Sequence, residues 1–311
     1  MKKSIVLEKT LVVHQDPAAI KPLFELLEIH GCAVTFAPDT EAAVLQPNLQ
    51  QYRLIIVSDA LRFIDLGGLL KRLREGLLTG GLPVLVITQG DPDSEQNVKL
   101  RLAGAAAVVS ESVGFPEIAS LAAQLIARQK EYRLDPVTGL VAGPFLDNVL
   151  ERLCSRNTFS WYFLEIKLLS LKAINYQYGY DSGDEMMARL AEMLEAEIHL
   201  QGTETDFAGR LYGTRFCVVS RARNIDSLCR NIITKSGRVF RKFYTPFEWM
   251  KGHVTVEGGK KAGNYHLCDV VIAALQVPSG WDNNRAYLLD IADEVLMQIP
   301  KSKNKYLIVN P

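Results

Sequence analysis

The first 130 residues alternate short, continuously apolar runs with stretches whose apolar residues recur at helical spacing. A continuous apolar run of about four to eight residues is typical of a strand buried on both faces of a sheet. Such runs predict five strands, at Thr10–Val13, Ala33–Phe36, Leu54–Val57, Pro83–Thr88 and Ala106–Val109. Alternation with helices indicates a parallel sheet that is covered on both faces. The functional side chains of such a domain are expected at the carboxyl ends of its strands.

The stretches between these strands carry helix signals. Asp16 followed by Pro17 predicts a helix start, with aspartate as the N-cap and proline at the first helical position. Helical spacing also predicts helices at Leu66–Leu78 and Asn97–Ala103. The five runs and these helices together predict an α/β domain over residues 1–130.

A long amphipathic helix is predicted at Pro116–Arg133, and it runs into Asp135 without a Gly/Ser-rich linker. A continuous helix transmits rotation or translation, whereas a flexible linker does not. The helix can pair with its copy in a dimer, or it can pack on the sheet of its own domain. The sequence leaves both arrangements open.

The second half of the chain, residues 131–311, predicts another α/β domain. Its expected elements are strands at Phe163–Leu168, Phe216–Ser220 and Val270–Leu275, a strand pair around Gly258-Gly259, and a helix at Met186–Leu194. A length of 311 residues suits two domains of about 150 residues each.

Composition narrows the class of protein. Hydrophobic residues make up 48% and charged residues 23%, which is the balance of a globular protein. Lys plus Arg equals Asp plus Glu at 35 each, so the net charge does not attract nucleic acid or an anionic membrane. No apolar run approaches the roughly 20 residues of a membrane span. The five cysteines include no C-x-x-C pair and are expected to be reduced, in a cytoplasmic protein.

The first half resembles response-regulator receiver domains. The resemblance rests on Tyr52–Ser58, Pro83–Thr88 and the pair Gly104-Ala105, which match the third strand, the fourth strand and the approach to the fifth. It implies a flavodoxin-like fold with a five-stranded parallel sheet.

Receiver chemistry needs an acidic pair for Mg²⁺, an aspartate that accepts phosphate, and a lysine. At the matching positions this chain has His14 and Gln15 for the acidic pair, Ser58 for the phosphoacceptor and Glu111 for the lysine. Thr88 keeps the type that the resemblance implies. His14 is either a phosphoacceptor or metal ligand, or a polar residue at a strand end. The substitutions predict a pseudo-receiver, which binds partners or dimerises.

The second half resembles GGDEF domains, over nearly all of residues 134–311. Asp135–Leu140 matches the motif that opens the family, and Leu171–Glu185 matches Phe-Lys-x-Ile-Asn-Asp-x-Tyr-Gly-His-x-x-Gly-Asp-Glu. Ala292–Leu296 and Asn304 match the closing segments. The resemblance implies a domain related to nucleotidyl cyclases. Active members condense two GTP molecules into cyclic di-GMP across a dimer, with metal ions.

The residues that this chemistry requires are replaced. The signature Gly-Gly-Asp/Glu-Glu-Phe reads Tyr212-Gly213-Thr214-Arg215-Phe216, so both acidic positions are lost. The metal-binding carboxylate of the first strand falls on Lys167, which repels Mg²⁺, and the closing lysine falls on or beside Pro300. No catalytic residue, metal or cofactor is therefore assigned.

Asn175 and Asp184 keep the types that the family uses to recognise guanine. Alternatively, Ser182 and Glu185 form a capping box, with Asp184 in the first helical turn. The Arg-x-x-Asp motif that binds the product falls on residues 203–206 without its arginine, since Thr203 occupies that position.

Arginines at four positions form a basic stretch, namely Arg210, Arg215, Arg221 and Arg223. In the expected fold Lys167 lies close to this stretch. It is either a new anion site in place of the metal site or a solvated loop.

Three functions remain open at this point. The preferred one is a non-catalytic protein of two-component or cyclic di-GMP signalling, which binds protein partners or dimerises and neither binds nucleic acid nor inserts into a membrane. The second is a guanine-nucleotide sensor without turnover, and the third is a diguanylate cyclase that uses GTP and Mg²⁺.

Overall fold

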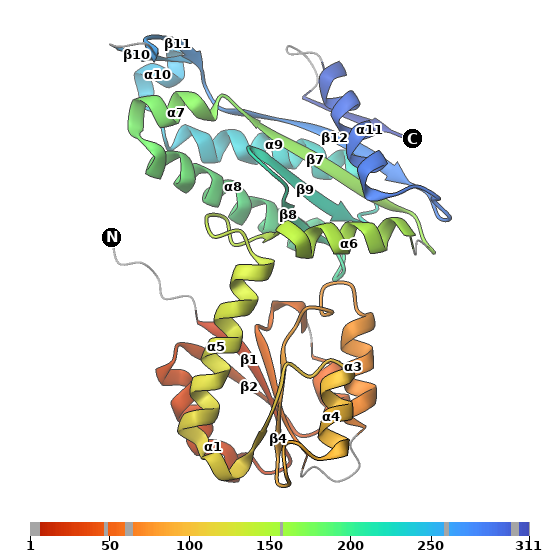
Figure 1. Cartoon of the computed structure of the whole chain (residues 1–311). Coiled ribbons are helices and arrows are strands. Elements are labelled where there is room, and N and C mark those ends of the chain that lie inside the picture. The colour runs from red at the N-terminus through yellow and green to blue at the C-terminus, as the bar shows by residue number, and fades with distance from the viewer. Residues whose placement is uncertain are drawn as a thin grey trace. The chain divides into compact units, whose positions relative to one another are not determined.

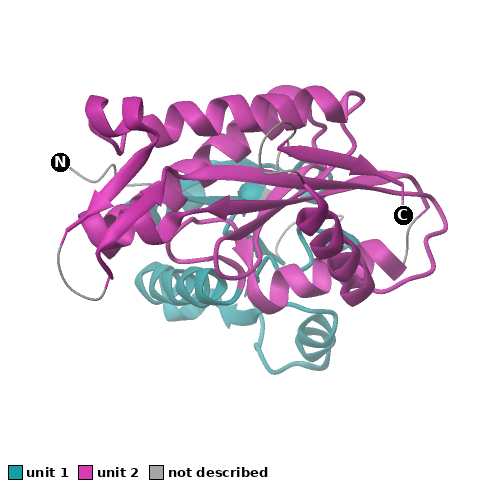
Figure 2. Cartoon of the chain, turned by 90° about the horizontal axis from the view of Figure 1, so that it is seen from above, with its two compact units in different colours: residues 1–132 teal, residues 133–311 magenta. Residues whose placement is uncertain are grey.

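The computed structural model describes residues 7–46, 49–59, 65–155, 158–257, 261–299 and 305–310. The chain divides into two compact units, residues 1–132 and residues 133–311, which Figure 2 shows in teal and magenta. Within the described ranges, no helix has both the length and the apolar character that a membrane crossing requires.

The sheet of the first unit has five strands in the order β2-β1-β3-β4-β5, and every neighbouring pair is parallel (Figure 1). The strands are β1 (Glu8–Val13), β2 (Cys32–Ala37), β3 (Leu54–Ser58), β4 (Val84–Thr88) and β5 (Ala107–Ser110). This order is that of the flavodoxin-like fold, so the predicted fold class is confirmed. The strand bounds agree with the sequence pattern within two residues at each end.

Helices cover both faces of this sheet. They are α1 (Pro17–Ile29), α2 (Thr40–Val44), α3 (Leu66–Glu75), α4 (Glu95–Leu102) and α5 (Phe115–Arg133). Successive residues of a strand point to opposite faces. Val13 accordingly joins the core that includes residues of α3, whereas Val12 joins the core that includes residues of α1 and α5. This two-sided burial is why the strands are continuously apolar.

Helix ends follow the local signals in one case and depart from them in another. The Ala18 N–H donates to Asp16 Oδ1 at 2.8 Å, so the predicted cap of α1 is confirmed. Helix α3 ends at Glu75 and does not reach Leu78, because Gly76 adopts an extended backbone (ψ 138°).

The second unit is built on a six-stranded sheet in the order β13-β12-β7-β9-β8-β6 (Figure 1). The strands are β6 (Val141–Ala142), β7 (Trp161–Leu169), β8 (Phe207–Arg210), β9 (Arg215–Ser220), β12 (Asp269–Val277) and β13 (Tyr306–Val309). The four central strands are antiparallel, and the two outer strands run parallel to their neighbours. The predicted α/β class is confirmed for this unit as well.

Strands β10 (His253–Val256) and β11 (Gly263–His266) form a separate antiparallel pair. The predicted strand pair is therefore present, but Gly258 and Gly259 of its expected turn lie outside the described residues, as do Pro300 and Asn304.

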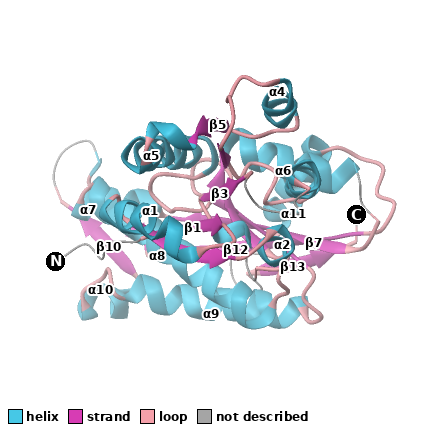
Figure 3. Ribbon diagram, turned by 90° about the horizontal axis from the view of Figure 1, so that it is seen from below, coloured by secondary structure: helices cyan, strands magenta, loops and turns pink. Residues whose placement is uncertain are grey.

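In the described part of the second unit, six helices flank the strands; helices are cyan in Figure 3. They are α6 (Gly143–Ser155), α7 (Leu171–Tyr178), α8 (Tyr180–Gln201), α9 (Ile225–Arg241), α10 (Pro246–Lys251) and α11 (Arg285–Gln298). Leu164 and Ile166 of β7 share one core with residues of α8 and α9. Glu165 points to the opposite face, where α6 and α11 pack against each other.

Candidate functional site

The segment Tyr212–Phe216 forms the turn and the first strand residues of the β8–β9 hairpin. The Arg215 N–H donates to the Tyr212 carbonyl at 3.0 Å, which closes a four-residue turn. Gly213 has φ +57°, whereas Thr214 stays outside the left-handed region. This is the pattern of a type II′ turn, in which glycine is favoured at the first central position. The glycine that remains of the signature is therefore needed by the backbone.

Two cations face each other where the resemblance implies carboxylates. Lys167 of β7 is in register with Arg215 of β9 in an antiparallel pair. Side chains that are directly opposite in such a pair lie on the same face of the sheet. Glu165, two residues before Lys167 on the same strand, shares that face. The sheet thus presents two positive charges and one negative charge side by side.

Arg215 is held by two carboxylates from distant parts of the chain. Its Nη1 donates to Glu165 Oε1 at 2.5 Å, and the same nitrogen donates to Asp293 Oδ1 of α11. The Glu165 side chain is 1% exposed and that of Asp293 is 31% exposed. The guanidinium also lies over the Tyr212 ring, 5.0 Å from its centroid. A buried ionic cluster therefore joins β7, β9 and α11.

The environment of this cluster shifts the pKa values of both Glu165 and Arg215. Burial raises the pKa of the Glu165 carboxyl, and the hydrogen bond and charge of Arg215 oppose that rise without cancelling it. Burial lowers the pKa of Arg215, but hydrogen bonds to Asp293 and Glu165 outweigh burial and leave that pKa above its usual value. The positive charge of Arg215 is thus already neutralised inside the protein, so Arg215 offers no free charge to an anion.

The Arg210 side chain donates hydrogen bonds to backbone carbonyl groups of the same turn. Its Nη1 donates to the Arg215 carbonyl at 2.8 Å, its Nη2 donates to the Gly213 carbonyl, and its guanidinium lies 4.7 Å from the Phe216 ring centroid. The residue is 8% exposed, and burial lowers its pKa. The interpretation of this stretch as a solvated loop is therefore wrong for Arg210 and Arg215, because both side chains are largely buried.

Asn175 and Asp184 lie on the adjoining helices α7 and α8. The Asn175 side chain packs against Gly183, where a Cβ would lie 1.9 Å from Asn175 Oδ1. That oxygen is buried and has no hydrogen-bond partner among the described residues. Asp184 is exposed and forms no hydrogen bond or ion pair with another residue in the same ranges. The unpaired oxygen of Asn175 and the exposed carboxylate of Asp184 thus lie on neighbouring helices.

The capping box expected at Ser182 and Glu185 is wrong. Helix α8 begins at Tyr180, with Gly179 as its N-cap and no side-chain cap. Gly179 has φ +90°, which lets the chain turn from α7 directly into α8, so the helix starts before Ser182. The Ser182 hydroxyl instead donates to the Tyr178 carbonyl at 3.0 Å. Helix capping therefore does not account for Asp184.

Asp206, the aspartate that remains of the product-binding motif, is hydrogen-bonded within the protein. Asp206 is 8% exposed and accepts three hydrogen bonds. The donors are the Thr203 hydroxyl at 2.6 Å, the Ser220 hydroxyl at 2.5 Å and the Arg221 N–H at 3.0 Å. The carboxylate thus ties the end of α8 to the end of β9, and its oxygens are already engaged.

In the first unit, the predicted residues lie at the carboxyl ends of the strands. His14 and Gln15 follow β1, Ser58 ends β3, Thr88 ends β4, and Glu111 follows β5 in a short 3-10 helix. Ser58 and Thr88 are buried, whereas Gln15 and Glu111 are exposed.

At the carboxyl ends of β1 and β4, His14 and Thr88 form contacts with nearby residues of the chain. His14 Nδ1 lies 2.8 Å from the Asp16 carbonyl oxygen in its own loop. The Thr88 hydroxyl oxygen accepts from the Gly90 N–H at 3.1 Å and from Asn97 Nδ2 at 3.4 Å. In the part of the chain that the structure describes, no three His, Cys, Asp or Glu side chains are grouped closely enough to hold a metal ion.

Sequence reasoning missed Glu165 and Asp293. The signal for Glu165 was a carboxylate inside the apolar run of β7, since a buried charge requires a partner. Asp293 carried no such signal, because an aspartate on the outer part of a helix is ordinarily solvated.

Comparison with known proteins gives one family match. The family model described as the GGDEF domain of diguanylate cyclases matches residues 132–260. The match includes Lys167, Asn175, Asp184 and the turn at Tyr212–Phe216, and it ends before Asp293.

Solved structures resemble each half of the chain. The coiled coil and GGDEF domain of DgcB from Caulobacter crescentus, solved with c-di-GMP, is 14% identical over 70% of this chain and 100% of that chain, with a TM-score of 0.45. Diguanylate cyclase SiaD from Pseudomonas aeruginosa, solved with its activator SiaC, is 20% identical over 63% and 68%, with a TM-score of 0.42. A CheY-like receiver domain protein from Methanospirillum hungatei is 21% identical over 40% and 98%, with a TM-score of 0.36.

Proposed function

We propose that this chain is a non-catalytic signalling protein of the response regulator/GGDEF type, which acts by binding protein partners. The observation that carries the proposal is the Arg215 guanidinium, which is enclosed by Glu165 and Asp293. Transfer of a phosphoryl group from GTP relies on divalent cations that bridge phosphate oxygens and neutralise developing charge. Because Glu165 and Asp293 are paired with the Arg215 guanidinium, neither carboxylate is free to coordinate a divalent cation.

Neighbouring residues support the same function. Lys167 adds a second positive charge beside Arg215, which disfavours a divalent cation at this face. Tyr212 places a ring, 55% exposed, at a position where the backbone of the family approaches phosphate. In the first unit, Ser58 and Glu111 replace the phosphoacceptor and the lysine.

Purified full-length protein is expected to form no cyclic di-GMP from GTP with Mg²⁺ or Mn²⁺, because Arg215 stands at an acidic position of the signature and is paired with Glu165 and Asp293. The product is measured by liquid chromatography after prolonged incubation, with an active diguanylate cyclase as the positive control. Product that appears with the wild-type chain and disappears with Asp184→Ala would overturn the proposal.

A second candidate function is guanine-nucleotide sensing without turnover, and one observation favours it. Asn175 Oδ1 is a buried acceptor without a partner among the described residues, and a guanine N–H is a donor of the right kind. Asp184, on the next helix, is an exposed carboxylate that can accept another.

The two candidates differ in their response to GTP. If the chain only binds proteins, the melting temperature changes by less than about 1 °C at roughly 1 mM GTP, whereas a bound nucleotide raises it. We expect the first result in a thermal-shift measurement with and without Mg²⁺. A rise that Asn175→Ala removes, while Gln177→Ala on the exposed side of α7 retains it, would establish the sensor instead.

A further inference from the structure

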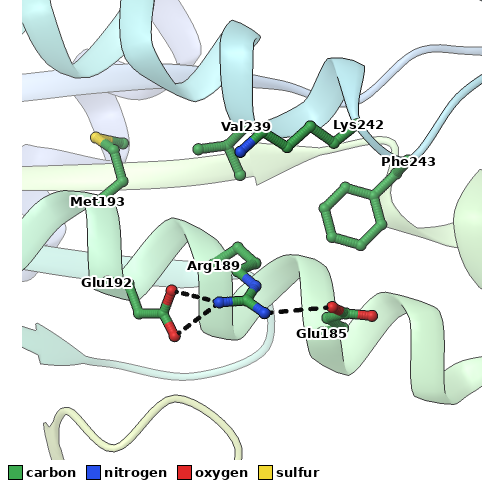
Figure 4. A pocket seen from close by; sticks show the side chains of 7 residues that line it. All are labelled: Glu185, Arg189, Glu192, Met193, Val239, Lys242 and Phe243. Atoms are coloured by element: carbon green, nitrogen blue, oxygen red, sulfur yellow. Dashed lines mark hydrogen bonds and ion pairs between the residues drawn. The ribbon is translucent and has the colours of Figure 1, made fainter. Parts of the chain in front are cut away.

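A groove of about 670 Å³ lies between α8 and the end of α9 in the second unit (Figure 4). Its lining residues are Glu185, Arg189, Glu192 and Met193 of α8, Val239 of α9, and Lys242 and Phe243, which follow α9. No function discussed above uses this groove.

The floor of the groove is apolar and belongs to the core of the unit. Met193 is a core residue, and Val239 and Phe243 are partly buried and pack against the same core. Because these side chains are held by the core, the floor is a small apolar surface with a fixed shape.

One wall of the groove is acidic. Glu185 and Glu192 hold Arg189 between them, with Arg189 Nη1 2.9 Å from Glu192 Oε2 and Arg189 Nη2 3.6 Å from Glu185 Oε1, as Figure 4 shows. Two carboxylates face one guanidinium, so the wall keeps a net negative charge. Asp181 and Asp184 extend the negative charge along the exposed side of α8.

The other wall is basic. Lys242 lines the groove, and Arg238 and Arg241 lie beside it on the last turns of α9. All three are exposed and form no ion pair with any residue that the structure describes. Arg238 and Lys242 are four residues apart and therefore lie on the same side of the helix. This wall carries positive charge that the unit does not neutralise.

We propose that this groove is the surface through which two copies of the chain associate. A two-fold axis that runs along the groove places the acidic wall of each copy against the basic wall of the other, and places the two apolar floors face to face. A partner surface of a single sign would meet like charge on one of the walls, which is costly. A second copy carries both signs in the required places. The inference does not depend on whether the chain is catalytic.

Charge reversal of each wall tests the arrangement in the full-length protein. The first variant is Glu185→Lys/Glu192→Lys, and the second is Arg238→Glu/Lys242→Glu. Each alone sets like charges against each other at both ends of the dimer, and we expect the dissociation constant to rise at least about tenfold. An equimolar mixture of the two variants pairs opposite charges again, and it is expected to recover dimers.

Sedimentation velocity over a concentration series measures the association, and tagged copies distinguish mixed dimers from self-pairs. Wild-type association is expected to weaken as salt rises, since exposed charges are screened. Lys21→Glu, on the exposed surface of α1, is the matched control and leaves association unchanged. The proposal is wrong if the wild type stays monomeric throughout, if both variants still dimerise alone, or if the mixture recovers no dimer.

Discussion

Arg215→Met is expected to lower the free energy of unfolding of the second unit by about 3–5 kcal/mol, which is the typical loss when one partner of a buried ion pair is removed. Glu165 is 1% exposed, so its carboxylate would remain in the protein interior without a counter-charge. Methionine fills similar space without charge, which separates the electrostatic loss from a loss of packing. Urea unfolding, followed by circular dichroism, measures the change.

The loss is expected to depend on pH in a defined direction. Burial already raises the pKa of Glu165 above its ordinary value of 4.5, and Arg215 opposes that rise. Without Arg215 the folded-state pKa rises further. When the pKa of a carboxyl is raised in the folded state, the free energy of unfolding falls as pH increases from the pKa of the unfolded state through that of the folded state. The deficit of Arg215→Met is therefore smallest near pH 4.5 and grows toward neutral pH.

Two further variants make this prediction specific. Adding Glu165→Gln to Arg215→Met removes the unpaired charge and is expected to recover part of the stability and to abolish most of the pH dependence. Arg223→Met, at an exposed position three residues beyond the end of β9, is the matched control and stays within about 0.5 kcal/mol of the wild type. A deficit that is equal at all pH values would contradict the ionic role of the cluster.

Asp206→Ala is expected to cost about 3 kcal/mol, because hydrogen bonds to a charged acceptor are among the stronger ones, and the buried Ser220 hydroxyl and the partly buried Arg221 N–H both lose their acceptor. The Ser220 hydroxyl, in a fully buried residue, and the Arg221 N–H would both be left without the carboxylate. Denaturant unfolding of the variant measures the effect.

The matched control for this prediction is Asp181→Ala, an exposed aspartate in the first turn of α8. We expect at most about 0.5 kcal/mol from that change. If both substitutions lower the free energy of unfolding equally, the hydrogen bonds of Asp206 between the end of α8 and β9 do not stabilise the fold. Thr203→Ala removes a single donor and is expected to cost about 1 kcal/mol.

The hydrogen bonds of Asp206 show why a residue that matches a binding motif does not by itself indicate a ligand site. The aspartate of the product-binding motif is present in the sequence, but its oxygens are engaged by Thr203, Ser220 and Arg221. Its presence is explained by folding and is not by itself an argument for ligand binding.

The two α/β folds and most of their strands could be predicted from the pattern of apolar residues and from the motifs. A strand that is buried on both faces must be apolar throughout, which is why β1, β3 and β4 were recognisable as continuous runs. The replaced positions Lys167, Thr214 and Arg215 were also readable, because the motif around Asn175 and Asp184 set the register of the resemblance.

The role of Arg215 could not be predicted from the sequence, because it depends on contacts between distant segments. Its partners Glu165 and Asp293 lie 50 and 78 residues away in sequence, and no local pattern brings the three together. Packing of α11 over the β7–β9 face does so, and burial then makes the pairing obligatory, since an ionised side chain in the interior must be neutralised. The start of α8 was likewise decided by the positive φ of Gly179 and not by Ser182, because backbone geometry overrides a capping pattern.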